Sequence, residues 1–146
     1  MERFSDLREP VVPDDVMMGL NVRNTKYHFV DLILDGKKTI ETRTHLALDI
    51  LLRNGLKDGM RIAIVSNSEI KGYATVVRTW KYETKKDFYK DYTKHFVDKD
   101  SEFAWDDRKK AGIELTDVEK LEEPIPIAKQ IGNKGFRTYK EIREFR

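Results

Sequence analysis

The sequence predicts an α+β domain built around a small, mostly antiparallel, barrel-like sheet with flanking helices. Two observations indicate this fold class. The strands expected over residues 59–68 and 70–82 are joined by a tight turn, which suits a hairpin and is too short for the crossover that parallel neighbours require. Helical segments are inserted between the other strands without the regular alternation of a doubly wound sheet. A Rossmann-type sheet is therefore disfavoured.

The chain begins with a segment that lacks hydrophobic periodicity. Residues 1–15 contain Pro10, Pro13 and an acidic pair, and we expect them to form an arm, with residues 16–146 as a single domain. A chain of 146 residues suits one domain with a substantial core. The apolar segment 16–23 is expected to be the first strand.

A helix is expected next, over about residues 25–35. Apolar side chains recur there at three- and four-residue spacing, namely Tyr27, Val30, Ile33 and Leu34. Asn24 or Thr25 can cap the start of this helix. Gly36 stands where a C-terminal cap belongs, because glycine enters the left-handed region at little cost.

The later elements are predicted from the same kinds of pattern. We expect a helix over 46–55, the two hairpin strands, a helix over 84–96 and a strand within 113–127. The core face of the 84–96 helix is expected to carry Phe88, Tyr92 and Phe96. Thr138 and Glu141 form a capping box, which predicts a short terminal helix.

Composition limits the classes of function. Lys and Arg number 28 against 26 Asp and Glu, a formal net charge of +2, so any anion-binding site must depend on a local patch. The absence of cysteine excludes disulfides, thiolate zinc sites and cysteine nucleophiles. The histidines His28, His45 and His95 are far apart, so we expect them at surface or packing positions and expect no metal or cofactor. Without a signal-like start or a membrane-length apolar run, the expected location is the cytoplasm.

The stretch LDGKKTIETR, residues 34–43, places three charged side chains where the first helix meets a strand. Residues two apart in a strand share a face, so Glu41 and Arg43 are expected about 7 Å apart, with Lys38 at the mouth of the turn. A cation, a planar donor fork and a carboxylate suit a ligand with phosphate and heterocycle edges. The alternative is a salt bridge on a solvated sheet face. A concave, partly buried location would favour the ligand site.

A second candidate is the stretch TWKYETKKDFYKDYTKHF, residues 79–96, in which aromatic and basic residues alternate. Its aromatic residues are candidates to stack on bases while nearby lysines meet phosphates, namely Trp80, Tyr82, Tyr89 and Tyr92. Trp105, further along the chain, is either a core anchor or a stacking wall. The alternative is that aromatic residues at helical spacing are core contacts and that the lysines only solvate the opposite face. The sequence leaves both interpretations open.

The helix, its glycine and the charged residues after it resemble the signature of the ASCH domain family, which has a PUA-like fold. In that family a helix ends in a glycine and a G-x-K-x-x-E-x-R pattern follows. The four positions of the pattern are filled here by Gly36, Lys38, Glu41 and Arg43. The resemblance continues in KDGMRIAIVS, in KGYATVV and in the segment LTDVEKLEEPIPI, and it covers roughly residues 18–140.

This resemblance implies a compact PUA-like β-barrel with flanking helices and a cleft near the motif. Members are mostly regarded as RNA-binding or nucleic-acid-associated modules. Some small members are hydrolases, namely amidohydrolases that deacylate acetylated cytidine nucleosides and a ribonuclease. The amidohydrolases carry a threonine nucleophile three residues after the lysine, where this chain has Glu41. A carboxylate cannot repeat that hydroxyl attack in the same way.

We therefore expect a domain that binds RNA or a nucleotide-like ligand. Lys38 and Arg43 would meet phosphates or base acceptors, and Glu41 would orient Arg43 or accept a base amino proton. A stacking wall would come from the aromatic residues Trp80, Tyr82 and Trp105. The alternatives are a small hydrolase that acts on a modified nucleoside or on RNA, and a protein-interaction module with a vestigial cleft. The sequence sets neither the ligand nor the oligomeric state.

Overall fold

The structure is a computed structural model that describes residues 16–126 and 137–138. In these residues a six-stranded sheet has the order β2-β5-β4-β3-β1-β6. Only the β1–β3 pair is parallel among the strand pairs of these residues. The strands are β1 (Val16–Asn21), β2 (Ile40–Arg43), β3 (Arg61–Ser66), β4 (Glu69–Lys81), β5 (Ala111–Pro126) and β6 (Arg137–Thr138). The predicted α+β class with a mostly antiparallel sheet is confirmed.

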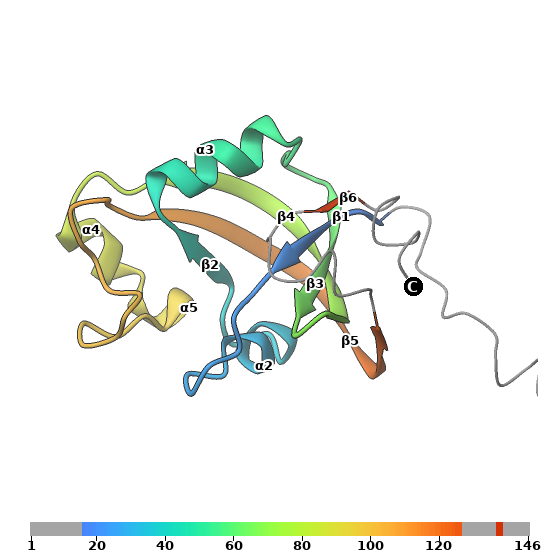
Figure 1. The fold of residues 1–146 in the computed structure, drawn as a ribbon. Helices are drawn as coiled ribbons and strands as arrows, with labels where there is room; N and C mark the ends of the chain where they lie inside the picture. Colours follow the sequence, from blue (N-terminus) through green and yellow to red (C-terminus); the bar gives the residue numbers. More distant parts are fainter. Residues whose placement is uncertain (1–15, 127–136, 139–146) are drawn as a thin grey trace, which may run out of the picture.

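The sheet curls because its two longest strands are irregular. The pairing register between β4 and β5 shifts at three places along their length. Bulges of this kind bend a strand and increase its twist. Figure 1 shows β4 and β5 arching behind the shorter strands β1 and β2, so that the sheet forms a half-barrel.

The tight turn predicted between the hairpin strands is confirmed. Ser66 of β3 pairs with Glu69 of β4, which leaves a two-residue loop of Asn67 and Ser68. Both loop residues have positive φ, 52° and 61°. Two positive φ values in a two-residue loop match the right-handed twist of the flanking strands.

Four helices surround the half-barrel in the described part of the chain. They are α2 (Phe29–Leu34), α3 (His45–Arg53), α4 (Lys85–Lys90) and α5 (Tyr92–His95). In Figure 1, α3 lies across the top of the sheet, α2 lies below it, and α4 and α5 lie at its left end. None of the helices in this part of the chain is long and apolar enough to cross a membrane.

The start of α2 differs from the prediction. The helix begins at Phe29, after His28 with φ 55°, and the first residue of the expected helix is several positions earlier. The Asn24 side chain still contacts the helix start, because its Oδ1 accepts a hydrogen bond from the Val30 amide at 3.1 Å. The predicted C-terminal glycine is confirmed, since Gly36 has φ 78°.

The predicted helix over 84–96 is wrong in one respect, because the chain breaks it at Asp91 into α4 and α5. The break rotates the second half, so Tyr92 is 41% exposed while His95 is fully buried against Phe88. Nε2 of the His95 ring lies 2.7 Å from the Phe88 carbonyl oxygen. Nδ1 of the same ring accepts a hydrogen bond from the Val97 amide at 2.9 Å. His95 is therefore a packing residue.

Two predicted segments lie outside the described residues. They are the arm over 1–15 and the terminal helix after Thr138. Thr138 itself is described and pairs with Met18 as part of β6.

Candidate functional site

Main-chain hydrogen bonds fix the joint between α2 and β2. The Lys38 amide donates to the Leu32 carbonyl at 2.9 Å, which closes the turn that Gly36 opens. The next amide, of Thr39, donates to the Lys94 carbonyl at the end of α5 at 2.9 Å. The charged motif is therefore fixed between α2, β2 and α5.

Lys38 is buried behind the motif and is only 1% exposed. Its ammonium donates to the carbonyls of Ile40, at 2.8 Å, and of His95. It also lies 3.6 Å from Glu41 Oε1 and 4.4 Å from the centre of the Phe29 ring. Burial lowers the pKa of the Lys38 ammonium from 10.5 to about 8, although the Glu41 carboxylate acts in the opposite direction. Lys38 thus anchors Glu41 from inside the fold.

Glu41 lies between two cations and is 4% exposed. Its Oε1 faces Lys38, and its Oε2 accepts a hydrogen bond from Arg43 Nη1. Burial alone would raise the pKa of the Glu41 carboxyl, but Arg43 and Lys38 outweigh it and hold this pKa below its usual value. Glu41 is therefore an ionised carboxylate with a fixed orientation.

Arg43 joins two strands that are far apart in the order of the sheet. From β2, its Nη2 donates to the Asn21 carbonyl at the end of β1 at 2.6 Å, and its Nη1 donates to the Thr42 carbonyl at 2.8 Å and to Glu41. Three of the five guanidinium N–H donors are used in this way, which leaves two for a ligand. The predicted proximity of Glu41 and Arg43 on one strand face is confirmed.

Glu41 and Arg43 line a pocket with a volume of about 380 Å³. Its walls come from the end of β1, from β2, from the start of α3 and from the loop before β5. The remaining lining residues are Asn21, Arg23, Phe29, Thr42, Thr44, Ala47, Glu102, Phe103, Arg108 and Lys110. Four cations and two carboxylates line the pocket, so its charge is positive although the chain is nearly neutral.

Lys110 is the pocket residue that differs most from an ordinary surface charge. It is 5% exposed, and its ammonium has no hydrogen-bond or ion-pair partner in the described part of the chain. Burial lowers the pKa of the Lys110 ammonium, and the nearby Arg108 and Arg43 add to this effect while Asp106 opposes it. Its ammonium is absent from the fully buried polar atoms that lack a partner, and the residue lines the pocket, so a pocket anion could pair with this poorly hydrated cation.

The other two cations of the pocket already have partners. Arg108 makes a bidentate contact with Asp106, in which Nε lies 3.3 Å from Oδ1 and Nη2 lies 2.6 Å from Oδ2. Arg23 lies 3.8 Å from Glu102 and above the Phe103 ring. Both pairs are largely exposed, so their contribution to stability is small and they can rearrange around a ligand.

The structure brings together some of the predicted site residues and separates others. Glu41 and Arg43 line the pocket, whereas Lys38 lies behind it. The three aromatic residues Trp80, Tyr82 and Trp105 do not line this pocket. Tyr82 is buried with its hydroxyl donating to Asp91 at 2.6 Å, and Trp80 packs on Gly112. Trp105 packs against the Phe88 ring. Their contact with a ligand stays a prediction.

Sequence reasoning missed the cations of the pocket outside the motif, namely Arg23, Arg108 and Lys110. The last two lie in the charged run DDRKK at 106–110, which has no periodic pattern. That loop returns to β2 because Ala111 of β5 pairs with Arg43. A loop position beside a long-range strand pair has no periodic pattern that sequence analysis can detect.

In residues 16–126 and 137–138, no group of three or more His, Asp or Glu side chains is placed to hold a metal ion. The chemistry of the site is that of donors, acceptors and charge. It can bind an anion at Lys110 and Arg43 and can accept a hydrogen bond at Glu41.

Solved structures of an ASCH protein from Zymomonas mobilis share this architecture. One such structure has a TM-score of 0.63 at 18% sequence identity, with 87% of this chain and 91% of that chain covered. The chain has the fold of the ASCH proteins. The predicted PUA-like fold class is thus confirmed, and the similarity at this level of identity concerns the fold alone.

Two variants of the same Zymomonas mobilis protein also match. A serine-to-alanine variant has a TM-score of 0.60 at 20% identity, with 91% of this chain and 95% of that chain covered. A tyrosine-to-phenylalanine variant has a TM-score of 0.63 at 19% identity, with 87% and 93% covered. No protein-family model and no curated protein matches the sequence. The ASCH fold therefore places the motif, and the function depends on the residues of this chain.

Proposed function

We propose that this ASCH-fold domain binds a nucleotide unit of single-stranded RNA, or a nucleotide-like ligand, in the pocket around Glu41, Arg43 and Lys110. The single observation that carries the proposal is Lys110, a pocket residue that is 5% exposed and has no ion pair with any residue that the structure describes, in the same pocket as an arginine that keeps two donors. Phosphate supplies the oxygens that such a pair of cations binds.

The carboxylate in the same pocket supports a ligand that also has hydrogen-bond donors. Glu41 is held in place by Lys38 and Arg43, and it keeps acceptor capacity toward the pocket. Phosphate alone would be repelled by this carboxylate, whereas the exocyclic amino group of a base would donate to it. A pocket of about 380 Å³ is in the usual range for small-ligand sites. Charge and size together favour a nucleotide.

Binding has more support than the hydrolase alternative. An amide hydrolase of the kind that the resemblance suggests needs a hydroxyl nucleophile where this chain has Glu41. The low pKa of the Glu41 carboxyl makes it a weak general base. Lys38, whose lowered pKa suits proton transfer better, is buried behind the pocket and does not line it. The geometry thus supports a binding role for this cluster.

The test is a binding titration with a fluorescent four-nucleotide RNA, followed by anisotropy at several salt concentrations. We expect Lys110→Met to weaken binding by at least tenfold. Its neighbour Lys109 is exposed, so Lys109→Met is the matched control and should change affinity by less than about twofold. Equal affinities for wild type and Lys110→Met would refute the proposed pocket. Turnover of RNA or of an acylated cytidine by the wild type, lost in Glu41→Gln, would instead support the hydrolase.

A further inference from the structure

A second pocket of about 580 Å³ lies beside the first and has a different chemistry. Three tyrosine rings line it, from the loop before α2, from α4 and from α5. Its lining residues are Lys26, Tyr27, Tyr89, Tyr92, Asp98, Lys99, Asp100 and Ser101. Two lysines balance two aspartates, so this pocket is aromatic and electrically neutral whereas the first pocket is positive.

The two pockets are lined by neighbouring residues. Ser101 lines the second pocket, and Phe103, two residues later, lines the first, so their Cα atoms are at most about 7 Å apart. Across this boundary, the Tyr27 ring of the second pocket lies 6.0 Å from the Phe103 ring of the first, edge to face. Tyr27 also stacks on Phe29, which lines the first pocket, with ring centres 5.6 Å apart. A continuous aromatic ridge therefore separates the pockets.

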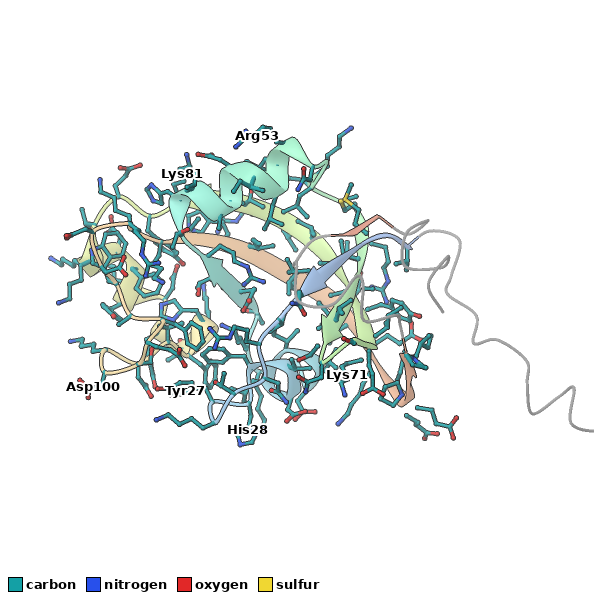
Figure 2. All side chains as sticks on the ribbon, in the orientation of Figure 1. Tyr27, His28, Arg53, Lys71, Lys81 and Asp100 are labelled. Carbon is teal, nitrogen blue, oxygen red and sulfur yellow. The ribbon has the colours of Figure 1, made fainter. Side chains whose placement is uncertain are left out.

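Lysine and carboxylate groups surround the rings of the second pocket. The Lys26 ammonium lies 5.4 Å from the centre of the Tyr27 ring, and the Lys99 ammonium lies 5.5 Å from that of Tyr89. The Tyr92 hydroxyl donates to Asp98 at 2.5 Å, which fixes this ring while 41% of the residue remains exposed. Figure 2 shows Tyr27 and Asp100 together at the lower left of the molecule, far from Lys81 and Arg53 on the opposite side.

These features suit the flat face of a base better than a phosphate. Aromatic side chains stack on bases of any sequence, and carboxylates such as Asp98 accept hydrogen bonds from base amino groups. Phosphate binding is disfavoured by the two aspartates, whereas a phosphate at the rim can still contact Lys26 or Lys99. A base beside the ridge would sit next to a nucleotide in the first pocket.

We propose that the second pocket holds the base adjacent to the nucleotide in the first pocket, so that the ligand is a single strand of at least two nucleotides. This inference rests on the proposed function of the first pocket. It assigns a stacking role to tyrosines that lie outside the motif and outside the first pocket. The most accessible of these rings is that of Tyr92.

The test compares a mononucleotide with longer strands by isothermal titration at low salt. The probes are cytidine 5′-monophosphate, the dinucleotide pCpC and the tetranucleotide of the same base. We expect pCpC to bind at least about fivefold more tightly than the mononucleotide, because stacking of one base on an aromatic ring contributes about 1–3 kcal/mol, or five- to 150-fold. Tyr92→Leu should remove this gain and leave the mononucleotide affinity unchanged.

Tyr92→Phe separates stacking from local structure. This variant keeps the ring and loses the hydrogen bond to Asp98, so it should retain most of the dinucleotide gain. Lys86→Ala, at an exposed position of α4 outside both pockets, is a control for charge and should leave the gain unchanged.

The possible failures of the two proposals are distinguishable. Equal binding of the mononucleotide and pCpC by the wild type overturns the second-pocket inference and leaves the first pocket intact. A Tyr92→Leu variant that weakens both probes equally also overturns it. Failure of all three probes to bind at low salt overturns the proposed function, and this inference with it.

Discussion

Replacement of Lys38 by methionine tests how the motif is built. The Lys38 ammonium is charged inside the fold, and burial lowers its pKa from 10.5 to about 8. Between these two pH values the unfolded chain binds more protons at this site than the folded chain does. The free energy of unfolding must therefore increase as the pH rises through this window. Below pH 8 both states are protonated, so the destabilisation by the buried charge is fully present.

The magnitude follows from the shift. A difference of roughly 2.5 pKa units corresponds to about 3 kcal/mol in total. The part released between pH 7.5 and pH 9.5 is about 2 kcal/mol. The assay is urea unfolding of wild type and Lys38→Met at intervals across this range, since groups that titrate in both proteins cancel in the difference. Across this pH range the free energy of unfolding of the wild type should rise by about 2 kcal/mol relative to that of the variant.

The adjacent residue provides the matched control. Lys37 is exposed, so Lys37→Met should give a curve parallel to that of the wild type. A direct titration of the Lys38 ammonium by NMR in the wild-type protein should have a midpoint near pH 8. Parallel curves for wild type and Lys38→Met, or a midpoint near 10.5, would refute the account of Lys38 as a buried anchor for Glu41.

Three further predictions concern stability, each measured by chemical unfolding. Gly72→Ala should destabilise the fold by about 3 kcal/mol, because a Cβ there would lie 2.3 Å from a main-chain carbonyl oxygen of β5 and 2.6 Å from the Leu34 side chain. An unchanged unfolding midpoint would contradict this and show that the sheet relaxes around the extra carbon. Thr44→Ala should lower the free energy of unfolding by about 1 kcal/mol, because the Thr44 hydroxyl caps α3 by accepting a hydrogen bond from the Ala47 amide at 3.2 Å. Thr44→Ser keeps a hydroxyl and should retain most of this stability. The lowered pKa of the Glu41 carboxyl stabilises the fold above about pH 4.5 and is lost in more acidic solution, so Glu41→Gln should flatten the acid side of the pH–stability curve; an identical acid limb would contradict this.

Local patterns in the sequence were enough to predict the motif. The apolar spacing of α2, the glycine at position 36 and the alternation of β2 together predict that Glu41 and Arg43 share a face, as the structure shows. These features depend on residues within a few positions of one another, so their physical causes are visible in the sequence. The same holds for the β3–β4 hairpin.

The rest of the site depends on contacts between distant residues. Lys38 was expected at the mouth of the turn, where it would meet the ligand. Its ammonium instead donates a hydrogen bond inside the fold to the carbonyl of His95, 57 residues away. Lys110 enters the pocket because the register of β5 against β2 ends there. Sequence periodicity does not encode the register of a long-range strand pair, so neither position was predictable.

The aromatic residues show a second limit of sequence reasoning. Trp80 and Tyr82 occupy strand and loop positions next to many lysines, and the pattern fits a stacking wall as well as a core. The structure buries Tyr82 against Phe88. Tyr92 is 41% exposed, because the helix breaks at Asp91 just before it.

The most direct test of the central claim is chemical-shift mapping by NMR of the isotope-labelled protein during titration with pCpC. We predict that the largest changes fall on Glu41, Arg43 and Lys110, with a second group at Tyr27 and Tyr92. Changes confined to the β3–β4 hairpin, or no changes at low salt, would contradict the claim that this pocket binds a nucleotide.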